Sequence, residues 1–189
     1  ANTLRVYGWL VTSDHRAFVD AVHAHGLKLM ATFYMGTAEE TPVSTAAQRS
    51  AVIERFVTQV ARYQPRVLWW SFGNELNGVW NGFLRQLGSD PERPPCAWDD
   101  RPDSEGGCWL GANTPPRPGD PCYEPTFCVY SRLFAFVEEA AVAAKRVADV
   151  LVVSAFADVD ALYDKVARAG SFAPSVDAWT AQVYRGASF

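Results

Sequence analysis

The chain of 189 residues is 49% hydrophobic and 20% charged, which is typical of a globular domain with a sizeable apolar core. The net charge is −4 and the sequence has no basic stripe, so we expect no nucleic acid partner. No apolar run approaches the roughly 20 residues that span a bilayer, and we therefore expect no membrane span.

Strands and helices are expected to alternate along the chain. The apolar patterning predicts strands at about 4–9, 27–35, 67–74, 150–156 and 176–184. Helices are predicted at about 14–25 after Ser13-Asp14, after a capping box at Thr45, at about 129–148, and in a short form after Asp158. Strict alternation indicates parallel strands joined by right-handed crossovers, in one domain over residues 1–189.

The first strand alternates between two kinds of side chain. If Leu4 and Val6 face the covering helices, then Arg5, Tyr7 and Trp9 share the opposite face. Three of the predicted strands carry bulky polar residues on one face in this way. Such residues suit the interior of a barrel near its catalytic rim.

The stretch from Val67 to Asn77 is apolar and aromatic before it ends abruptly in Gly73-Asn74-Glu75. A run of this kind predicts a buried strand, and parallel β/α proteins place their chemistry where such strands end. We therefore interpret Glu75 as a catalytic acid/base and Asn74 as a residue that orients substrate beside it. The alternative is that Asn-Glu only caps the strand and starts a turn.

The segment 76–128 is a long insertion that contains all the cysteines, namely Cys96, Cys108, Cys122 and Cys128. None forms a CxxC pair and no histidine is near in sequence, so we predict no metal site and no cofactor. An even number of cysteines in one polar loop favours two disulfides, with three possible pairings, over four free thiols. Disulfides imply an oxidising compartment, so the expected location is extracellular or periplasmic.

The number of strands predicts an incomplete barrel. Five strands and four helices do not close a (β/α)8 barrel, which takes eight of each in about 250 residues. The chain also begins and ends on a strand, and two open apolar edges favour association. We therefore expect a piece of a TIM barrel. An open doubly wound sheet is the rival, although no glycine-rich phosphate turn follows the first strand.

Three segments resemble the clan A glycoside hydrolases: LRVYG at 4–8, FGNE at 72–75, and VDAWTAQVYRGASF at 176–189. Within that clan they look most similar to β-1,3-glucanases, glucanosyltransferases and β-galactosidases or β-glucuronidases. The resemblance implies an eightfold β/α barrel of which this chain supplies strands two to six. Glu75 would then end strand four as the acid/base, and the insertion would follow that strand.

The resemblance also implies roles for other residues. Asn74 would contact the sugar 2-hydroxyl, and Arg5 would support the nucleophile. Tyr184 matches a cleft aromatic on strand six, whereas Gln182 stands where relatives often have Asn. The nucleophilic Glu would lie on strand seven, beyond Phe189, so the chain alone is expected to be inactive.

Aromatic residues complete the expected site. Apolar surroundings raise the pKa of a carboxyl group, and Trp70, Phe72 and Trp80 are expected to do so for Glu75. The faces of Tyr7, Trp9 or Trp80 are candidates for stacking on sugar rings, although each is also a candidate core residue.

Together these features predict a secreted retaining glycosidase or transglycosylase acting on β-linked oligo- or polysaccharides. The alternatives are a non-catalytic carbohydrate-binding barrel, and an open α/β domain with an unrelated ligand.

Overall fold

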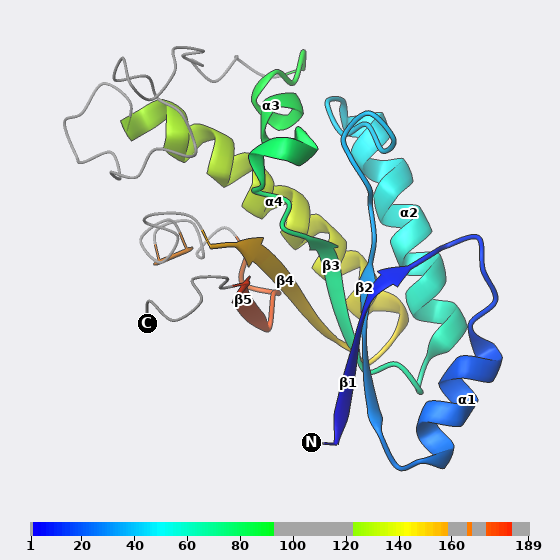
Figure 1. Cartoon of the computed structure of the whole chain (residues 1–189). Coiled ribbons are helices and arrows are strands. Elements are labelled where there is room, and N and C mark those ends of the chain that lie inside the picture. The colour runs from blue at the N-terminus through cyan, green and yellow to red at the C-terminus, as the bar shows by residue number, and fades with distance from the viewer. Residues whose placement is uncertain (1, 93–122, 159–165, 168–172, 183–189) are drawn as a thin grey trace.

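The computed structural model describes residues 2–92, 123–158, 166–167 and 173–182. These residues form an α/β fold with one five-stranded sheet in the order β1-β2-β3-β4-β5, all of whose neighbours are parallel (Figure 1). The strands are β1 (Thr3–Trp9), β2 (Lys28–Phe33), β3 (Trp69–Asn74), β4 (Leu151–Ala157) and β5 (Ala178–Gln182). The predicted parallel sheet alternating with helices is confirmed.

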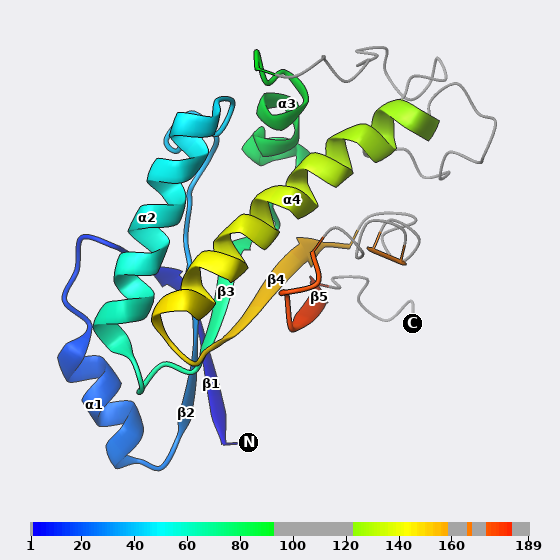
Figure 2. The ribbon, with the colours of Figure 1, turned by 180° about the vertical axis from the view of Figure 1, so that it is seen from behind.

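The helices alternate with the strands and gather on one face of the sheet, the face turned toward the viewer in Figure 2. They are α1 (Arg16–Ala24), α2 (Ala46–Tyr63), the 3-10 turn η1 (Val79–Asn81), α3 (Phe83–Gly88) and α4 (Tyr123–Val147). The aromatic rings of Phe33, Phe56, Phe72 and Phe136 pack between the sheet and the helices at centroid distances of 5.0 to 5.9 Å. The apolar core therefore lies on the helix side of the sheet.

Two of the four predicted helix starts turn out differently from each other. The capping box at Thr45 is confirmed, because its side chain accepts from the N–H of Gln48 while the Gln48 side chain accepts from the N–H of Thr45. The first helix begins at Arg16, later than predicted, and its N-cap residue His15 makes no side-chain cap. Asp14 instead accepts hydrogen bonds from the backbone and the guanidinium of Arg16.

The face predicted for Trp9 is wrong. A register shift between Val6 and Trp9 in the β1–β2 pairing turns the end of β1 over, so that Trp9 pairs with Phe33 on the helix side. Its ring is fully buried, lies edge-on to Tyr63 and donates a hydrogen bond to Gln59. Trp9 is therefore a core residue and does not offer a face to a sugar.

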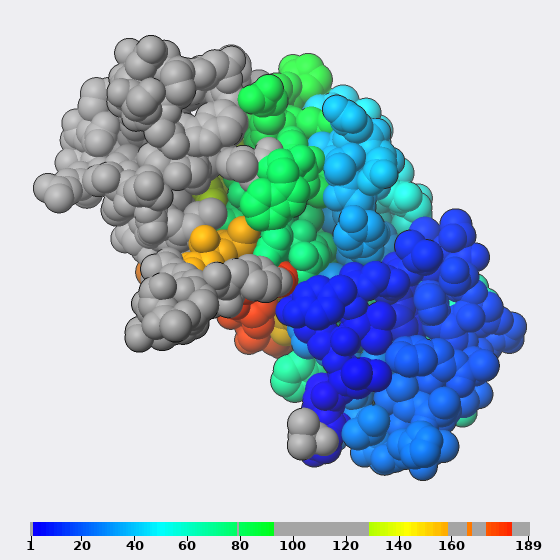
Figure 3. Space-filling model, in the orientation of Figure 1, coloured from blue at the N-terminus to red at the C-terminus, as the bar shows by residue number. Residues whose placement is uncertain are grey.

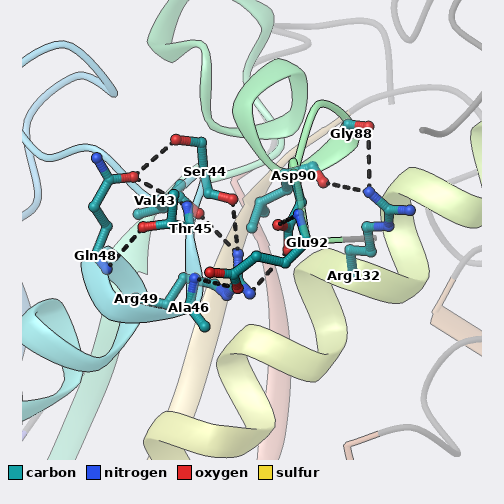
Figure 4. Close-up of polar contacts among 11 residues, drawn as sticks. Val43, Ser44, Thr45, Ala46, Gln48, Arg49, Gly88, Asp90, Glu92 and Arg132 are labelled. Atoms are coloured by element: carbon teal, nitrogen blue, oxygen red, sulfur yellow. Dashed lines mark hydrogen bonds and ion pairs between the residues drawn. The ribbon is translucent and has the colours of Figure 1, made fainter. Parts of the chain in front are cut away.

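The insertion after β3 begins with the ordered elements η1 and α3, which the sequence did not reveal. A buried polar network, shown in Figure 4, ties the end of α3 to the start of α2 and to α4. Arg49 pairs with Asp90 at 2.9 Å and donates to the carbonyl groups of Val43 and Ser44. Arg132 of α4 donates to the Gly88 carbonyl at 3.2 Å. The first part of the insertion is thus fixed to the helical layer.

Some predictions fall outside the residues that the structure describes. Cys96, Cys108 and Cys122 lie in 93–122, and the side chain of Cys128, at the start of α4, is not described either. The disulfides therefore stay a prediction, as does the role of Tyr184. In the described part of the chain, every helix is too short or too polar to cross a lipid bilayer.

Candidate active site

Three polar side chains from strands that are not neighbours meet on the face opposite the helices. The Oδ1 atom of Asn74, at the end of β3, accepts a hydrogen bond from Arg5 Nη2 of β1 at 3.2 Å. It accepts another from Gln182 Nε2 of β5. Because β1 and β5 each lie two strands from β3, these contacts require a strongly curved sheet, and Figure 3 shows the blue β1 and red β5 surfaces approaching each other.

A local irregularity turns Asn74 toward this face. Simple alternation along β3 would place Asn74 with Trp70 and Phe72 on the helix side. The β3–β4 register instead shifts between Ser71 and Asn74, with Gly73 at a φ of 70°. A bulge of this kind adds one residue and reverses the direction of the next side chain. Asn74 therefore points away from the helices.

Gly73 gives a direct test of this geometry. Its φ of +70° is costly for any residue with a side chain, and an added Cβ would lie 2.5 Å from the nearest Leu76 side-chain atom. We expect Gly73→Ala to lower the free energy of unfolding by more than about 1 kcal/mol, as measured by urea unfolding. Gly8→Ala is the control, because a Cβ at Gly8 would meet no atom within 4 Å and its φ is ordinary. Equal effects at the two positions would contradict this description.

The backbone around Glu75 is held in an unusual conformation. Glu75 has a φ of 52°, in the left-handed region that only a few non-glycine residues adopt. Its N–H still pairs with the carbonyl of Ala155 in β4 at 2.7 Å. Its own carbonyl accepts from the Gly78 N–H at 2.7 Å and from Asn81 Nδ2 at 2.6 Å. These three hydrogen bonds fix Glu75 at the carboxyl edge of the sheet.

The Glu75 carboxyl group is partly buried, and this burial raises its pKa above the usual value of 4.5, while the positive charge of Arg5 opposes the rise. Trp70 and Phe72, predicted to surround the carboxyl group, pack on the helix side instead. The pKa is therefore shifted in the expected direction, whereas those two rings lie in the core. In a group of this kind the proton is retained to higher pH than in an exposed glutamate.

Arg5 connects the network to Tyr7. The guanidinium donates to the Tyr7 hydroxyl at 3.3 Å and lies over its ring, 4.2 Å from the centroid. The Nε atom of Arg5 is buried and has no hydrogen-bond partner among the described residues. A buried N–H donor ordinarily pairs with a hydrogen-bond acceptor.

The structure thus places five of the predicted residues in one connected group, namely Arg5, Tyr7, Asn74, Glu75 and Gln182. Trp80 follows in η1, where its side chain is 66% exposed and its ring lies against Gly78. The Tyr7 side chain is also exposed, at 49%. Both aromatic side chains are therefore accessible to a ligand.

Two asparagines that no sequence motif marks, Asn77 and Asn81, also shape this site. The Asn81 side chain donates a hydrogen bond to the Glu75 carbonyl. The backbone carbonyl of Asn81 accepts a hydrogen bond from the Ala38 N–H at 2.7 Å. Asn77 is completely buried. Asn in a turn is ordinary, so the only available signal was that two of them follow Glu75 within six positions.

The described residues contain no group of three or more His, Cys, Asp or Glu side chains arranged to hold a metal ion. No family model matches the chain. A comparison with curated proteins likewise finds no match.

Proposed function

We propose that the chain forms strands two to six of a (β/α)8 barrel, with a disulfide-bonded insertion after the fourth barrel strand. The strand order follows the chain order without reversal, and the helices lie on one face of the sheet. A doubly wound sheet reverses its order and carries helices on both faces. The strong curvature needed for the Arg5, Asn74 and Gln182 contacts also favours a barrel wall.

We further propose that the complete barrel is a retaining β-glycoside hydrolase or transglycosylase with Glu75 as its general acid/base. One observation carries this proposal. Glu75 sits at the carboxyl edge of the parallel sheet with a raised pKa, beside a network made by Arg5, Asn74 and Gln182. Glycoside cleavage requires a carboxyl group that keeps its proton and lies beside polar groups that can bind a sugar.

In this reaction Glu75 acts twice. It first donates its proton to the glycosidic oxygen, while a second carboxylate attacks C1 and the leaving sugar departs. The resulting Glu75 carboxylate then removes a proton from water, or from an acceptor sugar hydroxyl, which attacks C1 and releases the second carboxylate. We assign this nucleophile to a carboxylate outside the described residues. The unpaired Nε of Arg5 is a suitable donor to it.

Asn74 is assigned to the sugar 2-hydroxyl. Its Oδ1 is occupied by two donors, Arg5 and Gln182, which determines the orientation of the amide. Nδ2 has no partner among the described residues and is left to donate to the substrate. A hydrogen bond to the 2-hydroxyl strengthens as the oxocarbenium-like transition state forms.

The substrate class proposed is a β-linked oligo- or polysaccharide. The exposed rings of Tyr7 and Trp80 offer apolar faces of the kind on which sugars stack. We propose no cofactor or metal for this reaction, since two carboxyl groups suffice for it. An extracellular or periplasmic location follows if the four cysteines form the expected disulfides.

The stereochemistry of the product tests this proposal. The full-length enzyme, in which the barrel is complete, is incubated with β-linked glucan and galactan oligosaccharides, and the anomeric proton of the first product is followed by NMR. We expect the β-anomer to appear first and the α-anomer only later, by mutarotation. Initial formation of the α-anomer would exclude the retaining mechanism, and sugar binding without any turnover would favour a binding barrel.

A further inference from the structure

The side chain of Asn77 forms hydrogen bonds with the end of β4, like those that the backbone of a neighbouring strand would form. Its Oδ1 accepts from the Ala157 N–H at 2.8 Å, and its Nδ2 donates to the Ala157 carbonyl at 3.1 Å. Nδ2 also lies 3.5 Å from the hydroxyl of Tyr130 in α4. Both the Asn77 and Tyr130 side chains are fully buried. One carboxamide therefore satisfies two backbone groups and contacts the helical layer.

The Asn77 side chain continues the hydrogen bonding to β4 beyond the last backbone hydrogen bond. Asn74 is in register with Ala155, and the Glu75 N–H makes the last backbone bond from β3 to β4. At Glu75 the chain turns into the left-handed region and leaves the sheet. The Asn77 carboxamide then continues the pairing at Ala157, two residues further along β4. Glu75 is thus held between two attachments to the same strand.

The second attachment also reaches β5. Ala157 is in register with Gln182, whose side chain donates to Asn74. The path from Asn77 through Ala157 and Gln182 therefore returns to the residue next to Glu75. A change at Asn77 alters both the backbone that carries the carboxyl group and the strand that supports its amide neighbour.

We propose that Asn77 is a positioning residue: its carboxamide fixes the backbone of Glu75 against the ends of β4 and β5. This inference rests on the acid/base role proposed for Glu75. The competing explanation is that Asn77 only satisfies buried backbone groups and contributes stability, as many buried asparagines do.

The test compares Asn77→Ala with the wild type in the full-length enzyme. The truncation leaves both backbone groups of Ala157 without their partner and releases the turn after Glu75. We expect kcat on a substrate with a poor leaving group to fall about 100-fold, with a much smaller change in KM, because small misplacements of a catalytic group have effects of this size.

The pH profile adds a readout that loss of stability alone does not move. Burial raises the pKa of Glu75, so a looser backbone that exposes the carboxyl group lowers this pKa. The high-pH limb of kcat/KM then shifts to lower pH. The neighbouring groups come from three elements: β1 contributes the positive charge of Arg5, β5 contributes the uncharged Gln182, and α4 contributes Tyr130. Burial raises the pKa of Tyr130 to about 12. Arg5 is unchanged by the substitution.

A second variant covers the case in which Asn77→Ala does not fold. Asn77→Asp keeps the size and the acceptor for the Ala157 N–H, and in its protonated form it also keeps a donor for the Ala157 carbonyl. We expect its activity relative to wild type to be high at acidic pH and to fall as the introduced carboxyl group ionises. A relative activity independent of pH would count against positioning.

Asp177 provides the matched control at the opposite end of β4. Its carboxylate accepts from the Val152 N–H at 2.7 Å and from Lys145 Nζ at 2.8 Å. We expect Asp177→Ala to lower the melting temperature while leaving kcat and the pH profile unchanged. If Asn77→Ala behaves in the same way, the positioning role is overturned.

Failure of the inference can be separated from failure of the proposed function. If Glu75→Gln leaves the activity intact, the acid/base assignment has failed, whatever Asn77 does. The pKa of the Glu75 carboxyl group can still be measured by carbon NMR in the wild type and in Asn77→Ala. A lower pKa in the variant supports positioning, and an unchanged one contradicts it, in both cases independently of activity.

Discussion

Replacing the Glu75 carboxyl group with an amide is expected to lower kcat/KM on glycans with poor leaving groups by about a thousandfold. Glu75→Gln keeps the size and the backbone contacts to Ala155, Gly78 and Asn81, so the fold should stay intact. In the proposed mechanism this substitution removes the proton that Glu75 donates to the glycosidic oxygen. Substrates with activated aryl leaving groups need little protonation, so their glycosylation step should slow far less.

The pH dependence of the wild type follows from the same group. In the proposed mechanism the reaction begins with protonated Glu75, so we expect kcat/KM to fall as pH rises through the pKa of Glu75, which burial places above 4.5. This high-pH limb should disappear in Glu75→Gln, which cannot titrate. The measurement is a set of initial rates from about pH 4 to pH 9 on both substrate types.

Glu54→Gln is the control, since Glu54 is exposed and belongs to α2 in the helical layer. It makes the same chemical change and should leave the rates as they are. Unchanged rates in Glu75→Gln on poor leaving groups would remove Glu75 from the mechanism. An equal loss on activated and poor substrates would point to a role other than proton donation.

The largest stability effect is expected at the buried ion pair of Arg49 and Asp90. Their side chains are only 7% and 1% exposed, and their charged atoms lie 2.9 Å apart. Asp90→Asn leaves the guanidinium buried without its counter-charge, and we expect a loss of about 3 to 5 kcal/mol in urea unfolding. The pair joins α2 to the segment after α3 (Figure 4), so the loss should also loosen the insertion.

Two comparisons make this prediction specific. Removing both charges, in Arg49→Met with Asp90→Leu, should cost less than the single change, because no uncompensated charge stays buried. The exposed pair of Arg66 and Asp20, with side chains 53% and 56% exposed, provides the control. Asp20→Asn should change stability by at most about 1 kcal/mol. Similar losses at Asp90 and Asp20 would contradict the importance of burial.

The sequence was sufficient to predict the strands and the place where the candidate site lies. The apolar run before Asn74 and Glu75 marks a buried strand, and parallel strands place their carboxyl ends on one edge. Arg5 and Gln182 were found through the resemblance, and they meet Asn74 in the structure. The strands depend on short-range pattern and on topology, which periodicity reports well.

The features that the sequence did not reveal depend on single-residue shifts or on distant partners. One extra residue in β1 before Trp9 directs the Trp9 side chain into the core. One extra residue in β3 before Asn74 directs the Asn74 side chain toward the site. Asn77 meets Ala157 across 80 positions of sequence, and no local pattern marks that pairing. The ion pair of Arg49 with Asp90 likewise depends on the position of α3, which precedes Asp90 in the chain.

Chemical rescue tests the central claim most directly. Glu75→Ala of the full-length enzyme is supplied with an activated aryl β-glycoside and sodium azide, and the product is identified by NMR. If Glu75 is the acid/base, azide attacks the glycosyl-enzyme at C1 and displaces the enzyme carboxylate, so a β-glycosyl azide is predicted. An α-glycosyl azide would make Glu75 the nucleophile instead, and the absence of any glycosyl azide would contradict its role as the acid/base.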